Sequence, residues 1–239
     1  MARQTIRPDR PHAIVCEGRD AENYLIWMLR ALIVDDDVFD LFQVIDAGGI
    51  DDLSKYIAAM PKLSNFSAIR TLTIVRDAET NAVGSDQSAR SLLKRCRFAA
   101  PASACSPCHP CGDERNVITG YALFPCFDRE VENGAIEDLC LKTLTEKNAE
   151  EKLCIVDDAI SRVERTSGKL KWINKSRLHT YLSLSDKFVT LKLGESARAG
   201  AYDFHASALE PFKNFLRSMV DAAEHGLNGR LRPTGSESA

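Results

Sequence analysis

The chain has 239 residues with 31 basic and 34 acidic side chains, and its formal charge of −3 argues against a basic coat for non-specific nucleic-acid binding. Hydrophobic residues make up 44% and charged residues 27%, the balance of a globular protein with a sizeable core. No apolar run approaches the roughly 20 residues that span a bilayer, and residues 1–11 lack the apolar stretch of a signal peptide. We therefore expect a cytoplasmic protein without membrane contact, whose eight cysteines are thiols or metal ligands rather than disulfides.

The first half of the chain alternates segments typical of strands and of helices. Short apolar or β-branched runs predict buried strands over 13–16, 41–45, 69–75 and 117–124. Between them, apolar residues at helical spacing predict helices over 20–34, 51–60 and 85–98. This alternation predicts a Rossmann-like α/β fold with a mainly parallel sheet of about four strands, flanked on both faces by helices.

The second half is predicted to be almost entirely helical, over 135–146, 153–165, 176–184 and 207–225. An irregular insertion rich in Cys and Pro interrupts the α/β pattern over 99–116. We expect one α/β domain over 10–147, a helical extension over 148–225 packed on the same domain, and a disordered tail over 226–239. Periodicity leaves open whether the last helices surround the sheet or form a small lobe.

Acidic residues follow two of the predicted strands at the edge where ligands gather in open parallel sheets. Glu17 follows the first strand, and Asp77 and Glu79 follow the third. In an extended segment, positions 77 and 79 point the same way, so both carboxylates can face one ion. Mg²⁺ and Mn²⁺ prefer such oxygen ligands. The alternative is that acids at strand ends only cap the next helix, as Asp20 and Glu22 can.

Residues suited to phosphate binding lie near these acids in the sequence. Gly18 allows a tight turn, and Gly48 and Gly49 allow a phosphate or backbone to come close. Arg76 either contacts a phosphate or pairs with a neighbouring acid. Lys175 belongs to a basic run that either steers a nucleic-acid backbone or forms a solvated helix face; the run comprises Lys169, Lys171, Lys175, Arg177 and His179 and includes Trp172.

The insertion contains a second candidate metal site. Four cysteines are enough to bind zinc tetrahedrally, and the insertion offers three of them with one more upstream: Cys96, Cys105, Cys108 and Cys111. Prolines stand inside both Cys-x-x-Cys links, so the alternative is a reduced, exposed loop. The chain has no Gly-Lys-Ser/Thr phosphate loop, and any ATPase activity would therefore come from a separate partner subunit.

Two segments resemble the motifs of Toprim domains. Residues 14–20, Ile-Val-Cys-Glu-Gly-Arg-Asp, resemble the first motif, and residues 72–79, Leu-Thr-Ile-Val-Arg-Asp-Ala-Glu, resemble the second. Phe124-Pro125 and the sequence Gly-Ala-Ile-Glu-Asp-Leu over 134–139 are similar to small stand-alone Toprim-like bacterial proteins of unknown function. The likeness covers most of residues 10–220 and extends more distantly to the overcoming-lysogenisation-defect nucleases.

The resemblance implies a metal-dependent nuclease acting on DNA or RNA. It implies that Glu17 is a metal ligand or general acid/base, and that Asp77 and Glu79 hold Mg²⁺ or Mn²⁺, with Glu137 as an extra ligand. Glu17 and Asp77 would be the catalytic pair.

Two other classes of function compete with a nuclease. The first is a catalytically degenerate Toprim-fold module that binds a nucleotide, nucleic acid or protein; the overall acidity favours it, and so does Glu79, which stands where the family has Asp. The second is an interaction protein stabilised by zinc in the insertion.

Overall fold

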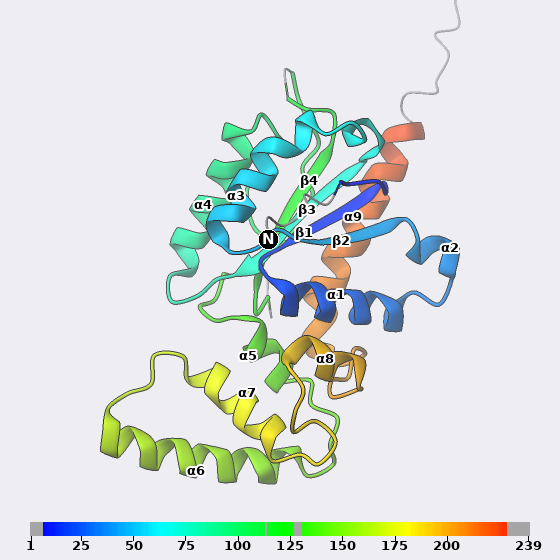
Figure 1. Ribbon diagram of the computed structural model, residues 1–239. Coiled ribbons are helices and arrows are strands. Elements are labelled where there is room, and N and C mark those ends of the chain that lie inside the picture. The colour runs from blue at the N-terminus through cyan, green and yellow to red at the C-terminus, as the bar shows by residue number, and fades with distance from the viewer. Residues whose placement is uncertain (1–6, 113, 127–130, 229–239) are drawn as a thin grey trace, which may run out of the picture.

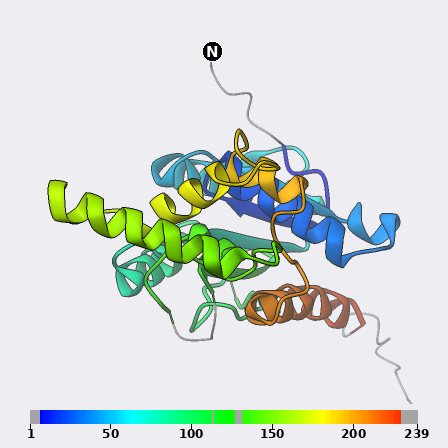
Figure 2. The ribbon, with the colours of Figure 1, turned by 90° about the horizontal axis from the view of Figure 1, so that it is seen from below.

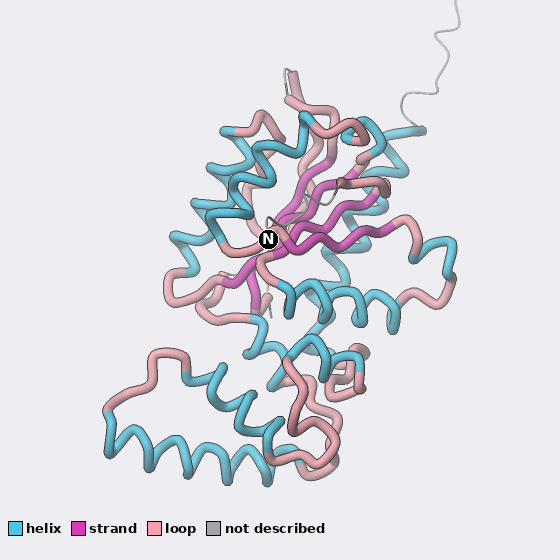
Figure 3. The backbone as a smooth tube through the Cα atoms, viewed as in Figure 1, coloured by secondary structure: helices cyan, strands magenta, loops and turns pink. Residues whose placement is uncertain are grey.

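The sheet of this protein is parallel, as the sequence predicts. The computed structural model describes residues 7–112, 114–126 and 131–228, and within them four strands lie in the order β2-β1-β3-β4 (Figures 1 and 3). The strands are β1 (His12–Cys16), β2 (Phe42–Asp46), β3 (Thr71–Asp77) and β4 (Ile118–Phe124). Cys16 lies beside Asp46 on one side and Val75 on the other. β1 and β2 therefore end level with each other, while β3 continues to Asp77, which lies beside Phe124 at the end of β4.

Alternate residues of the strands point into two separate cores. Ile14 and Val75 face a core shared with α1 (Arg19–Leu32) and α9 (Glu210–Asn228). Their neighbours Val15 and Ile74 face a core shared with α3 (Ile50–Ala59) and α4 (Ala82–Arg95). This alternation is the period of two expected of a strand. The result is a three-layer α/β/α arrangement (Figure 1).

Some of the helices after the sheet form a small lobe, and another packs on the sheet, so both arrangements that periodicity left open occur. α6 (Ala149–Ser167) and α7 (Ile173–Ser183) project together below the sheet, and Figure 2 shows α6 extending past the rest of the protein. α9 instead returns to cover the sheet. The shorter elements are α2 (Asp36–Phe39), α5 (Ile136–Leu141), α8 (Leu193–Arg198), η1 (Met60–Lys62), η2 (Phe66–Ala68) and η3 (Ser207–Leu209).

The contact between α9 and β4 depends on Gly120. A Cβ atom at this position would lie 2.7 Å from both Met219 Sδ and Phe215 Cζ. The side chains of Met219 and Phe215 are both buried. The helix therefore packs directly on the glycine, at a distance that no larger residue permits without movement of its neighbours.

The insertion over 99–116 has neither helix nor strand in its described part, but it is not detached from the sheet. Cys108 pairs with Thr119 of β4 in an antiparallel bridge, with N–H···O distances of 2.8 and 3.0 Å. The Cys105 N–H also donates to the Tyr121 carbonyl over 2.8 Å. The insertion thus lies along the outer edge of β4.

The C-terminal end of the chain is described in part. The first residues of the predicted tail continue α9 to Asn228, and residues 229–239 lie outside the described part of the chain. Within the described residues, no helix combines the length and the apolar character needed to cross a membrane.

Candidate functional site

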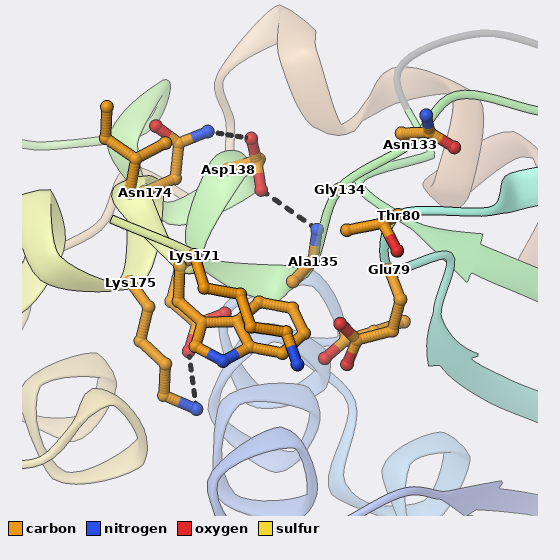
Figure 4. Close-up of a pocket in the computed structure, with 13 residues that line it drawn as sticks. Glu79, Thr80, Asn133, Gly134, Ala135, Asp138, Lys171, Asn174 and Lys175 are labelled. Carbon is orange, nitrogen blue, oxygen red and sulfur yellow. Dashed lines mark hydrogen bonds and ion pairs between the residues drawn. The ribbon is translucent and has the colours of Figure 1, made fainter. Parts of the chain in front are cut away.

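A pocket of about 580 Å³ lies beyond the carboxyl end of β3 (Figure 4). Three segments that are distant in sequence line it: the turn after β3, the segment that leads into α5, and the start of α7. The lining residues are Asp77, Glu79, Thr80, Asn133, Gly134, Ala135, Glu137, Asp138, Lys171, Trp172, Ile173, Asn174 and Lys175.

Asp77 is the last residue of β3 and the most perturbed acid in the pocket. Its Oδ1 accepts a hydrogen bond from the Ile136 N–H at the start of α5, over 3.0 Å. The pKa of Asp77 is raised to about 8, chiefly by burial and also by the nearby carboxylates of Glu137, Glu79 and Glu17, against the lowering effect of that hydrogen bond. Asp77 is therefore surrounded by negative charge.

Glu79 is held next to Asp77 by a backbone pairing. Its N–H donates to the Gly134 carbonyl over 2.7 Å, and the Gly134 N–H donates to the Glu79 carbonyl over 2.8 Å. The φ angles are 57° at Glu79 and 144° at Gly134, and a Cβ at Gly134 would lie 3.0 Å from Pro125 Cδ. Glu79 Oε2 is buried, and within the described part of the chain it has no hydrogen-bond partner. A buried carboxylate oxygen without a hydrogen-bond partner lowers the stability of the fold, so its presence calls for an explanation.

Glu17 lies beside the pocket rather than in its wall. Its N–H donates to the Val75 carbonyl over 3.3 Å, which fixes it between the ends of β1 and β3. Half-burial raises the pKa of Glu17; Arg76 lowers it, Glu79 raises it, and a hydrogen bond from the Ile50 backbone lowers it. Glu17 therefore interacts electrostatically with the pocket acids while it contacts the start of α3.

The wall formed by α5 and α7 is held together by polar contacts. Asp138 accepts hydrogen bonds from the Ala135 N–H, over 2.9 Å, and from the Asn174 side chain (Figure 4). Lys175 Nζ lies 3.4 Å from Glu137 Oε1, and the Glu137 side chain is only 8% exposed. The start of α7 is thereby attached to α5 directly over the acids.

The structure brings together some of the residues predicted for the site. Asp77, Glu79, Glu137 and Lys175 line one pocket, and Glu17 lies next to it. Besides Glu17, the residues predicted for substrate binding that do not line it are Gly18, Gly48, Gly49 and Arg76. Gly18 and Gly48 have φ angles of 92° and 93°, Gly49 precedes the first residue of α3, and Arg76 Nη1 donates to Ser88 Oγ of α4 over 3.5 Å.

Asn133, Asp138 and Asn174 belong to the pocket although the sequence did not single them out as site residues. Asn133 Oδ1 accepts from the Ala82 N–H at the start of α4, over 2.8 Å, and so holds its loop in place. The Asn133-Gly134 pair is a turn signal that marks this loop in the sequence. Nothing in the sequence links Asn174 to Asp138, 36 residues earlier.

The cysteines of the insertion are dispersed. Cys105 Sγ lies 2.8 Å from Cys126 Sγ, Cys108 is paired with Thr119, Cys96 ends α4, and Cys111 is exposed. Among the residues that the structure describes, no three His, Cys, Asp or Glu side chains are grouped so that they could hold a metal ion as they stand. This holds for the cysteines and for the pocket carboxylates alike.

In a comparison with protein-family models, the chain matches a family model over residues 11–221. The matching model is described as a protein of unknown function, DUF3226. No curated protein and no solved structure matches the chain. The matched region contains all four strands and every residue of the pocket.

Proposed function

The chain belongs to DUF3226, a family of unknown function, and we propose from its site that it is a Toprim-like, metal-dependent phosphodiesterase acting on nucleic acid. The observation that carries the proposal is the acidic cluster at the carboxyl edge of a parallel sheet. Asp77, Glu79 and Glu137 line one pocket, and the nearby carboxylate of Glu17 helps to raise the pKa of Asp77. The resemblance of residues 14–20 and 72–79 to the Toprim motifs supports the same assignment.

The acids of the pocket fit Mg²⁺ or Mn²⁺. A divalent cation would offset the negative charges that raise the pKa of Asp77, and it would give the buried Glu79 Oε2 a partner. Mg²⁺ usually binds through one or two carboxylates together with water and substrate phosphates, so a complete set of protein ligands is not needed beforehand. Asp77 and Glu79 would hold the ion, with Glu137 as a further ligand.

The other groups of the pocket have roles that follow from their charge and position. A bound divalent ion neutralises a phosphate and lowers the pKa of water. Glu17, whose pKa is raised, is a better proton acceptor than an ordinary carboxylate and is the candidate general base. Lys171 and Lys175 lie across the pocket and suit the negative charge of a phosphate.

The proposal is tested by assaying cleavage of end-labelled DNA and RNA oligonucleotides with Mn²⁺ and with EDTA. We expect cleavage by the wild type only with Mn²⁺, and a loss on the order of 100-fold or more in Glu79→Gln, because glutamine keeps the size of the side chain but removes its charge. Glu151→Gln, on the exposed face of α6, is the matched control and should cleave like the wild type. Equal turnover in Glu79→Gln and wild type would contradict the assignment.

A second candidate is a Toprim-fold binding module without turnover. Two observations favour it: Glu79 stands where the motif has Asp, and the described carboxylates do not form a preassembled group of three. Calorimetric titration together with the cleavage assay separates the two candidates. The binding module would bind Mn²⁺ or an oligonucleotide in the titration but would cleave no oligonucleotide in the assay. Zinc binding by the insertion and an ATPase partner subunit stay predictions.

A further inference from the structure

The pocket has a second wall, which is basic and aromatic. The connection between α6 and α7 contributes Lys171 and Trp172, and the first turn of α7 contributes Lys175. Trp172 is 42% exposed, and Lys171 Nζ lies 4.6 Å from the centroid of its ring. In the view of Figure 4, Lys171 extends towards Glu79, whereas Lys175 points to its ion-pair partner Glu137. An exposed indole in a pocket wall is a binding surface rather than part of the core.

This wall is anchored on both sides. The Trp172 carbonyl accepts the Ser176 N–H over 3.0 Å, and the Leu170 N–H donates to Glu164 Oε1 of α6 over 2.9 Å. Further along α7, Arg177 donates two hydrogen bonds to the Asp157 carboxylate, over 2.6 and 2.8 Å. The aromatic ring is therefore presented from a fixed backbone, which reduces the entropy lost when a ligand binds.

The three chemical features of the pocket correspond to the parts of a nucleotide. An indole face can stack on a base, the lysines attract the phosphate backbone, and the acids could receive a phosphate once a divalent cation offsets their charge. Inside a duplex both faces of a base are covered by its neighbours, so an unpaired base is far more accessible to Trp172. A volume of about 580 Å³ is of the size that holds one small-molecule ligand.

We propose that the pocket binds an unpaired nucleotide of a single-stranded nucleic acid, with its base stacked on Trp172 and its phosphate between Lys171, Lys175 and the acidic cluster. The inference rests on the proposed function, since it names the substrate class of the same site. It makes Trp172 a specificity determinant that selects single strands over duplexes.

Tryptophan fluorescence tests the proposal without turnover. The chain has two tryptophans, so in Trp27→Phe the emission comes from Trp172 alone. We expect an oligothymidylate to quench this emission, in EDTA or with Ca²⁺, and a blunt duplex of equal length to leave it unchanged. The same titration is repeated with free thymidine monophosphate. Quenching by the monophosphate at the same concentrations as the oligomer would show that the pocket binds a free nucleotide rather than a nucleic-acid strand. No quenching by either ligand in both buffers would overturn the proposal.

Affinity measurements with a fluorescein-labelled oligothymidylate provide the matched variants. Trp172→Ala should weaken binding about tenfold or more, whereas Trp172→Phe keeps an aromatic face and should retain most of the affinity. Quenching without Mn²⁺-dependent cleavage would support this proposal and refute the phosphodiesterase. Cleavage of blunt duplex that is unaffected by Trp172→Ala would support the phosphodiesterase and refute the selection of single strands by Trp172.

Discussion

Replacing Asp77 with asparagine is expected to abolish Mn²⁺ binding and, at the same time, to stabilise the metal-free protein at neutral pH. The amide oxygen of asparagine can still accept the Ile136 N–H, so the link between β3 and α5 survives. The charge that burial and the neighbouring acids disfavour is removed. We expect a loss of Mn²⁺ affinity of at least about 100-fold, together with a gain on the order of 2 kcal/mol in the free energy of unfolding near pH 8.

The gain in stability should depend on pH in a definite direction. The folded protein holds a proton on Asp77 up to a pKa of about 8, whereas an unfolded aspartate releases it near its ordinary value of 3.8. The wild type therefore loses stability as the pH rises from about 4 to about 8, while Asp77→Asn does not. The difference between the two should be small near pH 4 and reach its full size near pH 8.

Thermal unfolding with EDTA and with Mn²⁺, at several pH values, measures both effects. Mn²⁺ should raise the melting temperature of the wild type at pH 8 and leave that of Asp77→Asn unchanged. Asp52→Asn is the matched control, because Asp52 is an exposed residue of α3 that pairs with Lys55. An Asp77→Asn protein that binds Mn²⁺ like the wild type would remove Asp77 from the metal site.

Replacing Gly120 with valine is expected to destabilise the fold by about 2–3 kcal/mol. A side chain at this position meets Met219 Sδ and the Phe215 ring at distances near 2.7 Å, so α9 has to move or the two side chains have to repack. Valine favours strands more than glycine does, and a loss of stability therefore reports the steric conflict rather than strand propensity. Denaturant unfolding followed by circular dichroism measures the change.

The variant Met219→Ala provides the control for this contact. Combined with Gly120→Val, it opens space for the new side chain, and the double variant should lose less stability than the sum of the two single losses. Strict additivity would show that valine is tolerated without pressing on α9, and the close packing of α9 on β4 would then not limit the residue at position 120.

The sheet was predictable because each strand carries its own signal. Segments such as 13–16 and 69–75 are short apolar runs, and a parallel sheet buried on both faces needs such runs. The short helices α2 and α8 have too few residues to show a period. The predicted helix over 135–146 ends at Leu141, and Thr143 Oγ1 donates to the Leu139 and Cys140 carbonyls just after this end, which competes with regular helix geometry.

The acidic side of the candidate site was easier to predict than its basic side. Glu17, Asp77 and Glu79 follow strands, so topology alone places them at one edge. Trp172 and Lys175 reach the same pocket through the packing of α7 on α5, a contact that depends on Asn174 and Asp138. Such contacts between distant segments leave no periodic trace in the sequence, and the basic run was equally compatible with a solvated helix face.

The bridge between Cys108 and Thr119 has a consequence for how the protein behaves in a crowded solution. A parallel sheet ends in strands whose outer N–H and C=O groups can recruit a strand from another molecule, which is a common route to aggregation. Along β4, the Cys105 and Cys108 N–H groups occupy the carbonyls of Tyr121 and Thr119 instead. In its described residues, the irregular, proline-rich insertion provides no long strand of its own to which a further strand could be added. The segment thus protects the protein from self-association at this edge, whether or not its thiols ever bind a metal.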